Sequence, residues 1–103
     1  MKLIEKISNM IEDEIDGAEC YAKMALTYKA DKPELARVMY SLSMQELQHM
    51  EELHGVVVNL IDEYRKDHGE PPADMRAIYD YLHERHINEA AEVRALQTAY
   101  RQQ

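Results

Sequence analysis

The stretch SMQELQHMEEL, residues 43–53, places a carboxylate and an imidazole three positions apart, at Glu46 and His49. Residues with this spacing lie on the same side of an α-helix, so both side chains could hold one ligand between them. Carboxylate oxygens and imidazole nitrogens bind divalent metal ions and also transfer protons. Either chemistry depends on which side of the helix the two residues occupy.

Helical geometry puts both residues in the centre of an apolar stripe. At about 100° per residue, and with Leu35 at zero, Glu46 falls at about 20° and His49 at about −40°. A second Glu-x-x-His pair, Glu51 and His54, follows directly, but Glu51 points about 160° away from the stripe. We therefore expect the first pair to face the core and Glu51 to face solvent. The apolar residues of the stripe are Leu35, Val38, Met39, Leu42, Leu53, Val56, Val57, Leu60, Ile61 and Tyr64.

The segments on either side also carry polar residues that face inward. In the first segment Glu14 lies within about 30° of the centre of the stripe, whereas Glu12 and Asp16 face outward. In the last segment His86 and Glu89 fill the centre of the stripe. The first stripe comprises Ile4, Ile7, Ile11, Ile15, Ala18, Tyr21, Ala22 and Ala25. The last comprises Met75, Ile78, Tyr79, Leu82, Val93, Leu96 and Tyr100.

Position along the bundle brings three of these residues together. Glu14 lies about 17 residues before the first turn, and Glu46 and His49 lie about 14 and 17 residues after it, so the three share one layer. Buried carboxylates usually pair with Lys or Arg. No basic residue occupies the centre of a stripe, and Arg85 lies on a flank. The donor set therefore predicts an external cation, with a layer of solvated polar groups as the alternative.

Three Gly and three Pro residues mark the ends of the elements. Asp31 and Glu34 predict an N-cap with its reciprocal partner. Gly69 and the two prolines after it predict a helix stop and restart. The chain is thus expected to form one all-α domain, residues 1–103, of long antiparallel helices and short loops. The predicted helices lie near residues 2–29, 32–68 and 72–102.

Composition excludes several classes of partner. The chain has 20 acidic and 12 basic residues, a formal net charge of −8, which disfavours binding to nucleic-acid phosphates or anionic membranes. No apolar run approaches the ~20 residues that span a bilayer, and the charged start is unlike a signal peptide. The single cysteine, Cys20, allows neither an intrachain disulfide nor a cysteine metal knot. We expect a cytoplasmic protein whose partners are cations or protein chains.

A first-helix glutamate followed about thirty residues later by Glu-x-x-His is the half-site pattern of the ferritin-like di-iron proteins. The runs EIDGAECYAKMA and SMQELQHMEEL resemble the first two helices of the rubrerythrin branch, over residues 1–68. The resemblance implies a ferritin-like fold in which Glu14 is a terminal ligand, Glu46 a bridging ligand and His49 a nitrogen ligand. It also implies that Tyr21, seven residues after Glu14, hydrogen-bonds to the site or quenches radicals there.

The chain departs from that family because it has no fourth helix with a second inward Glu-x-x-His, and no cysteine pairs of a rubredoxin module. Two copies related by a two-fold axis would supply the full ligand set, a solution that resembles the encapsulated ferritins. The other solution is intrachain, with Glu89 or Glu92 and His86 completing the site. We favour a homodimer, or a higher homo-oligomer, with a four-helix metal-binding core, and keep Glu89 as a further candidate ligand.

Mixed carboxylate and imidazole donors suit iron, or manganese, better than structural zinc, which prefers thiolates. A pair of Fe(II) ions could be oxidised together by oxygen or peroxide. We therefore expect a di-iron protein with ferroxidase or peroxide-reducing activity. The alternative is a metal-free ferritin-like bundle that acts as an oligomeric interaction or assembly protein, and substitution of Glu46 and His49 distinguishes the two.

Overall fold

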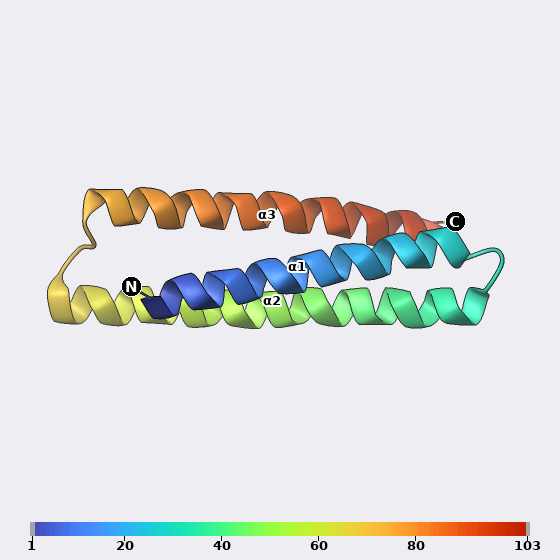
Figure 1. Ribbon diagram of the computed structural model, residues 1–103, viewed down its shortest axis with the longest axis horizontal. Coiled ribbons are helices and arrows are strands. Elements are labelled where there is room, and N and C mark those ends of the chain that lie inside the picture. Colours follow the sequence, from blue (N-terminus) through green and yellow to red (C-terminus); the bar gives the residue numbers. More distant parts are fainter. Residues whose placement is uncertain (1, 103) are drawn as a thin grey trace.

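Three long helices make up the computed structural model, which describes residues 2–102. They are α1 (Lys2–Tyr28), α2 (Pro33–His68) and α3 (Ala73–Gln102), and each runs antiparallel to the one before it (Figure 1). Within residues 2–102 there is no strand, so the predicted all-α architecture is confirmed. The molecule is a rod of 55 × 18 × 17 Å. None of the three helices, over the described residues, carries an apolar stretch that could cross a membrane.

Backbone groups close the turn between α1 and α2. The Lys32 N–H donates to the Tyr28 carbonyl at 2.8 Å, and Lys32 occupies the N-cap of α2 without a side-chain cap. Glu34 pairs with Arg37 at 3.0 Å. The predicted capping box between Asp31 and Glu34 is therefore wrong, because the hydrogen bonds of the turn put Lys32 at the position expected for Asp31.

The connection from α2 to α3 agrees with the predicted stop and restart. Gly69 has φ 78°, in the left-handed region that glycine adopts without a steric penalty, and its N–H donates to the Arg65 carbonyl at 2.9 Å. Pro71 and Pro72 follow, and α3 begins at Ala73. A proline cannot donate to the helical ladder, so the chain reverses here.

The core forms where α1 packs against both other helices. α3 contacts α1 more extensively than it contacts α2 (Figure 1). The predicted inward stripe of α1 is confirmed, apart from a half-buried Tyr21. The buried apolar residues of α1 are Ile4, Ile7, Ile11, Ile15, Ala18, Ala22 and Ala25.

The buried face of α2 differs from the predicted stripe. Its buried residues are Ala36, Ser43, Leu47 and Met50. These lie about 90° around the helix from Leu35, the predicted centre. Val38 and Val56, both assigned to the stripe, are 43% and 44% exposed. The difference arises because α1 approaches α2 beside the small residues Ala36 and Ser43, which leaves part of the apolar stripe at the surface.

A buried polar group joins all three helices in the half of the rod nearer the α1–α2 turn. The Ser43 hydroxyl donates to the Ala18 carbonyl at 2.7 Å and accepts from the Gln97 side-chain amide at 2.9 Å. Ala18 lies one turn after Glu14, and Ser43 lies one turn before Glu46. The Ser43 hydrogen bond therefore fixes the relative height of α1 and α2 close to these two glutamates.

Candidate metal centre

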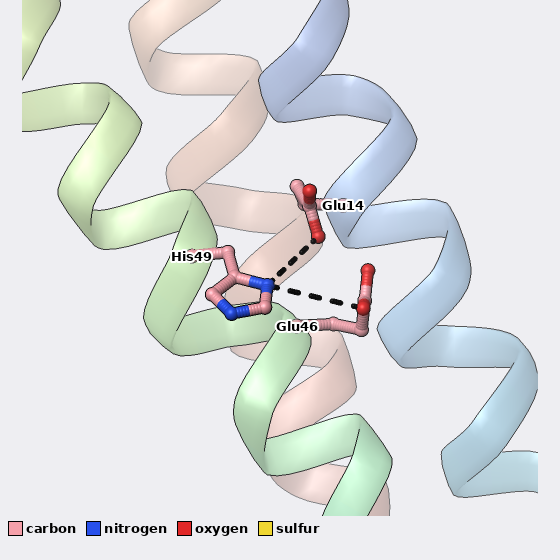
Figure 2. Close-up of side chains that lie close together, drawn as sticks. All are labelled: Glu14, Glu46 and His49. Atoms are coloured by element: carbon pink, nitrogen blue, oxygen red, sulfur yellow. Dashed lines mark ion pairs between the residues drawn. The ribbon is translucent and has the colours of Figure 1, made fainter.

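Two neighbouring helices bring Glu14, Glu46 and His49 together. α1 supplies Glu14, while α2 supplies Glu46 and His49 from the same side of one helical turn. Figure 2 shows the three side chains pointing toward one another between α1 and α2. The sequence predicted this grouping from the layer that the three residues share.

The distances leave room for an ion between the donor atoms. His49 Nδ1 lies 3.6 Å from Glu14 Oε2 and 3.9 Å from Glu46 Oε1 (Figure 2). One ligand atom from each residue lies within 4.8 Å of the other two. Ligands at about 2.1 Å from a metal ion are separated by roughly 3.0–3.5 Å in tetrahedral or octahedral geometry. The three donors therefore need to move by less than an ångström or so to coordinate one cation.

Burial makes this group of donors costly without a cation. The side chains of Glu14 and Glu46 are 26% and 27% exposed, whereas His49, which was expected to face the core, is 53% exposed. Glu14 Oε2 is buried and has no hydrogen-bond partner in the described chain. Among residues 2–102, no Lys or Arg forms an ion pair with either glutamate. A buried carboxylate oxygen in this state calls for a positive ligand.

The Glu14 carboxylate perturbs the neighbouring Glu46. The pKa of Glu46 is raised, first because Glu14 can share a hydrogen bond with it, and further by burial and by the charge of Glu14. The nearby His49 opposes this shift. A cation between the two carboxylates favours their ionised forms, so metal binding should lower the pKa of Glu46.

A glycine lies against the Glu46 carboxylate. A Cβ built on Gly17 would lie 3.2 Å from Glu46 Oε2, a tight contact that would require the carboxylate to shift by a few tenths of an ångström. Gly17 is in the middle of α1, where glycine is unfavourable for helix formation. A glycine within a helical pattern could be recognised from the sequence, but its contact with Glu46 of α2 could not.

Glu89 lies apart from the other predicted ligands, where α3 contacts α1. Arg85 donates to Glu89 at 2.7 Å and to Glu12 at 3.2 Å, and His86 Nε2 lies 3.1 Å from Glu12. Glu12, Asp16 and Glu89 form a second group of acidic residues with oxygens within 4.8 Å of one another. The expectation that Glu12 faces outward is wrong, because α3 packs on that side of α1.

The charge of this second group is partly compensated within the chain. Burial, and the hydrogen bond and charge of Glu89, raise the pKa of Glu12 to about 7. Burial acts in the same direction on Glu89, but hydrogen bonds from Arg85 and Glu12 outweigh it and lower the pKa of Glu89. Arg85 supplies the cation that the Glu14 group lacks. The intrachain solution through α3 is not seen, since over the described residues α3 adds no ligand atom to the Glu14 group.

The second Glu-x-x-His string behaves differently from the first. Glu51 is exposed, as predicted, and pairs with Arg94 of α3 at 2.8 Å. His54 Nε2 lies 2.8 Å from His83 Nδ1, with the two rings 18° from parallel. Burial, and then the charge of His83, lower the pKa of His54. Identical spacing thus gives a group of ligand atoms in one place and contacts between helices in the other.

Tyr21 lies on the same side of α1 as Glu14, about 10 Å further along the helix axis. It is half-buried, and its hydroxyl makes no hydrogen bond within residues 2–102. The role that the family resemblance implies for Tyr21 stays a prediction.

Comparison of this chain with protein-family models, with curated proteins and with solved structures gives no match. The ferritin-like resemblance of the first two helices is therefore an expectation from the sequence.

Proposed function

We propose that this chain binds iron through Glu14, Glu46 and His49 and promotes the oxidation of Fe(II). The observation that carries the proposal is the buried Glu14 Oε2, which has no hydrogen-bond partner within residues 2–102 and lies beside Glu46 and His49 but beside no Lys or Arg of the described chain. Two carboxylates and one imidazole provide oxygen and nitrogen donors that suit Fe(II) or Mn(II). A ferritin-like di-iron protein is the class that this donor set supports best.

The proposed chemistry divides between the metal and the chain. Glu14, Glu46 and His49 would hold the iron, and a pair of Fe(II) ions, when bound, would supply the two electrons that oxygen or hydrogen peroxide takes up. Glu14 and Glu46 would compensate the positive charge, and the raised pKa of Glu46 means that metal binding competes with protonation of this carboxylate. His49, at the exposed edge, leaves the site open to small oxidants.

A second copy of this chain is the proposed source of the remaining ligands. Three donors complete only half of a ferritin-like set, and a two-fold axis doubles them to two α1 glutamates and two Glu-x-x-His motifs. Apolar residues that a partner could cover surround the group. Val38 and Val56 lie within about 20° of His49 around α2, and Met10 lies one turn before Glu14. These three residues are 43%, 44% and 44% exposed, respectively.

Fe(II) titration of the purified chain without oxygen, followed by admission of air, tests the proposal. We expect saturable binding near one iron per chain and rapid growth of ferric absorbance. Glu46→Gln should weaken Fe(II) binding at least tenfold and abolish the rapid phase. Glu52→Gln is the matched control, because Glu52 is exposed on the same helix and should leave both measurements unchanged.

Circular dichroism would show whether each variant keeps its helices. A folded Glu46→Gln protein that binds and oxidises Fe(II) like the wild type contradicts the proposal. Absence of saturable binding in the wild type also contradicts it, and would favour the metal-free assembly protein instead.

A further inference from the structure

Gly17 is the residue on which the position of the Glu46 carboxylate depends most directly. A Cβ at residue 17 would lie 3.2 Å from Glu46 Oε2, 3.7 Å from Cδ and 3.8 Å from Cγ. All three atoms belong to the end of one side chain. Gly55 offers the contrast, since a Cβ there would meet no atom within 4 Å although Gly55 is also helical. Close contact with a ligand side chain thus distinguishes Gly17 from Gly55.

We propose that Gly17 is a positioning residue. Because it has no Cβ, the Glu46 carboxylate can lie against α1 and beside Glu14. This inference rests on the proposed function, because it gives a metal-binding purpose to the contact. Gly17 lies three residues after Glu14, on the same side of α1. The space it leaves therefore adjoins the Glu14 carboxylate, and Glu46 enters this space from α2.

The two helices cannot simply separate to admit a methyl group at residue 17. Ser43 is fully buried and donates to the carbonyl of Ala18, the residue directly after Gly17, at 2.7 Å. Ala18 and Ala22 are also buried at this contact, which keeps the two backbones close. A Cβ at residue 17 must therefore displace the flexible end of Glu46. Displacement moves one ligand away from the other two.

Gly17→Ala and Gly55→Ala form a matched pair. Both replace a helical glycine with the best helix former, so neither should lower the melting temperature. We expect Gly17→Ala to weaken Mn(II) binding, measured by electron paramagnetic resonance, at least tenfold, and to slow Fe(II) oxidation in proportion. Gly55→Ala should stay within twofold of the wild type in both measurements. Equal affinities in the two variants would overturn the inference.

A double-mutant cycle tests the contact without any metal. In the Glu46→Ala background the new methyl group has nothing to displace, so Gly17→Ala should raise the melting temperature more than it does in the wild type. Additive changes would overturn the proposed contact even where metal binds. A wild-type chain that binds neither Mn(II) nor Fe(II) would instead overturn the proposed function, and with it the role of Gly17, whatever the cycle gives.

Discussion

Ser43 offers the sharpest test of how the three helices are held together. Its hydroxyl donates to the Ala18 carbonyl of α1 and accepts from the Gln97 amide of α3, and both Ser43 and Gln97 are buried. Ser43→Ala removes both hydrogen bonds and leaves the Gln97 amide without this partner. A buried polar group that loses its partner bears its full desolvation cost.

The expected loss of stability follows from these contacts. Two hydrogen bonds and one unsatisfied buried amide contribute about 2–3 kcal/mol. Alanine is the better helix former and returns about 0.5 kcal/mol. The net loss in the free energy of unfolding is therefore about 2 kcal/mol, or about 8–16 °C in melting temperature for a chain of this size.

Urea and thermal unfolding, followed by circular dichroism at one fixed protein concentration, would measure this loss. Ser41→Ala is the matched control, since Ser41 is exposed on the same helix and only accepts from Gln45 at 3.3 Å. Its change should stay within about 0.5 kcal/mol. Gln97→Leu added to Ser43→Ala should recover stability, because both partners are then apolar. If Ser43→Ala is as stable as Ser41→Ala, the proposed interhelical contact is refuted.

Two pH-dependent predictions follow from the contacts of α3, both measured by urea unfolding between pH 5 and pH 8. The lowered pKa of His54 favours its neutral form in the folded chain. The contribution of this residue to stability is complete above the unfolded pKa and is lost as the pH falls from there through the folded pKa. His54→Gln should therefore lose less stability on acidification than the wild type. The pKa of Glu12 is raised to about 7, so its effect on stability changes with pH in the opposite direction. Its contribution is complete below the ordinary pKa and is lost as the pH rises toward 7, so Glu12→Gln should gain stability relative to the wild type over this range. Each prediction fails if the difference between variant and wild type does not change with pH.

The fold was largely predictable because its signals are local. Gly69 and the two prolines after it mark one turn, and the isoleucine spacing of α1 defines one buried side. The grouping of Glu14, Glu46 and His49 also followed from the sequence, since antiparallel helices joined by a short turn fix which layers meet. Distance from the turn was enough to group them, whereas direction around α2 was not, because His49 was expected in the core and is 53% exposed.

The remaining features depend on where α3 lies, which no local pattern states. The apolar residues of α2 alone predict a buried side centred on Leu35, whereas the folded chain buries the side that carries Ser43. Glu12 was expected in solvent, yet Arg85 and His86 of α3 approach it. Glu89, also on α3, pairs with the same Arg85 and lies away from the predicted metal site. Such pairings arise between helices far apart in sequence and require the packed structure.

Native mass spectrometry of the Fe(II)-loaded chain, prepared without oxygen, tests the central claim most directly. A half-site completed by a second copy predicts a species of two chains with two iron ions, and Glu46→Gln should lose that iron. Two iron ions on a single chain would contradict the shared site. Chains that carry no iron under conditions of excess Fe(II) would contradict the metal-binding function itself.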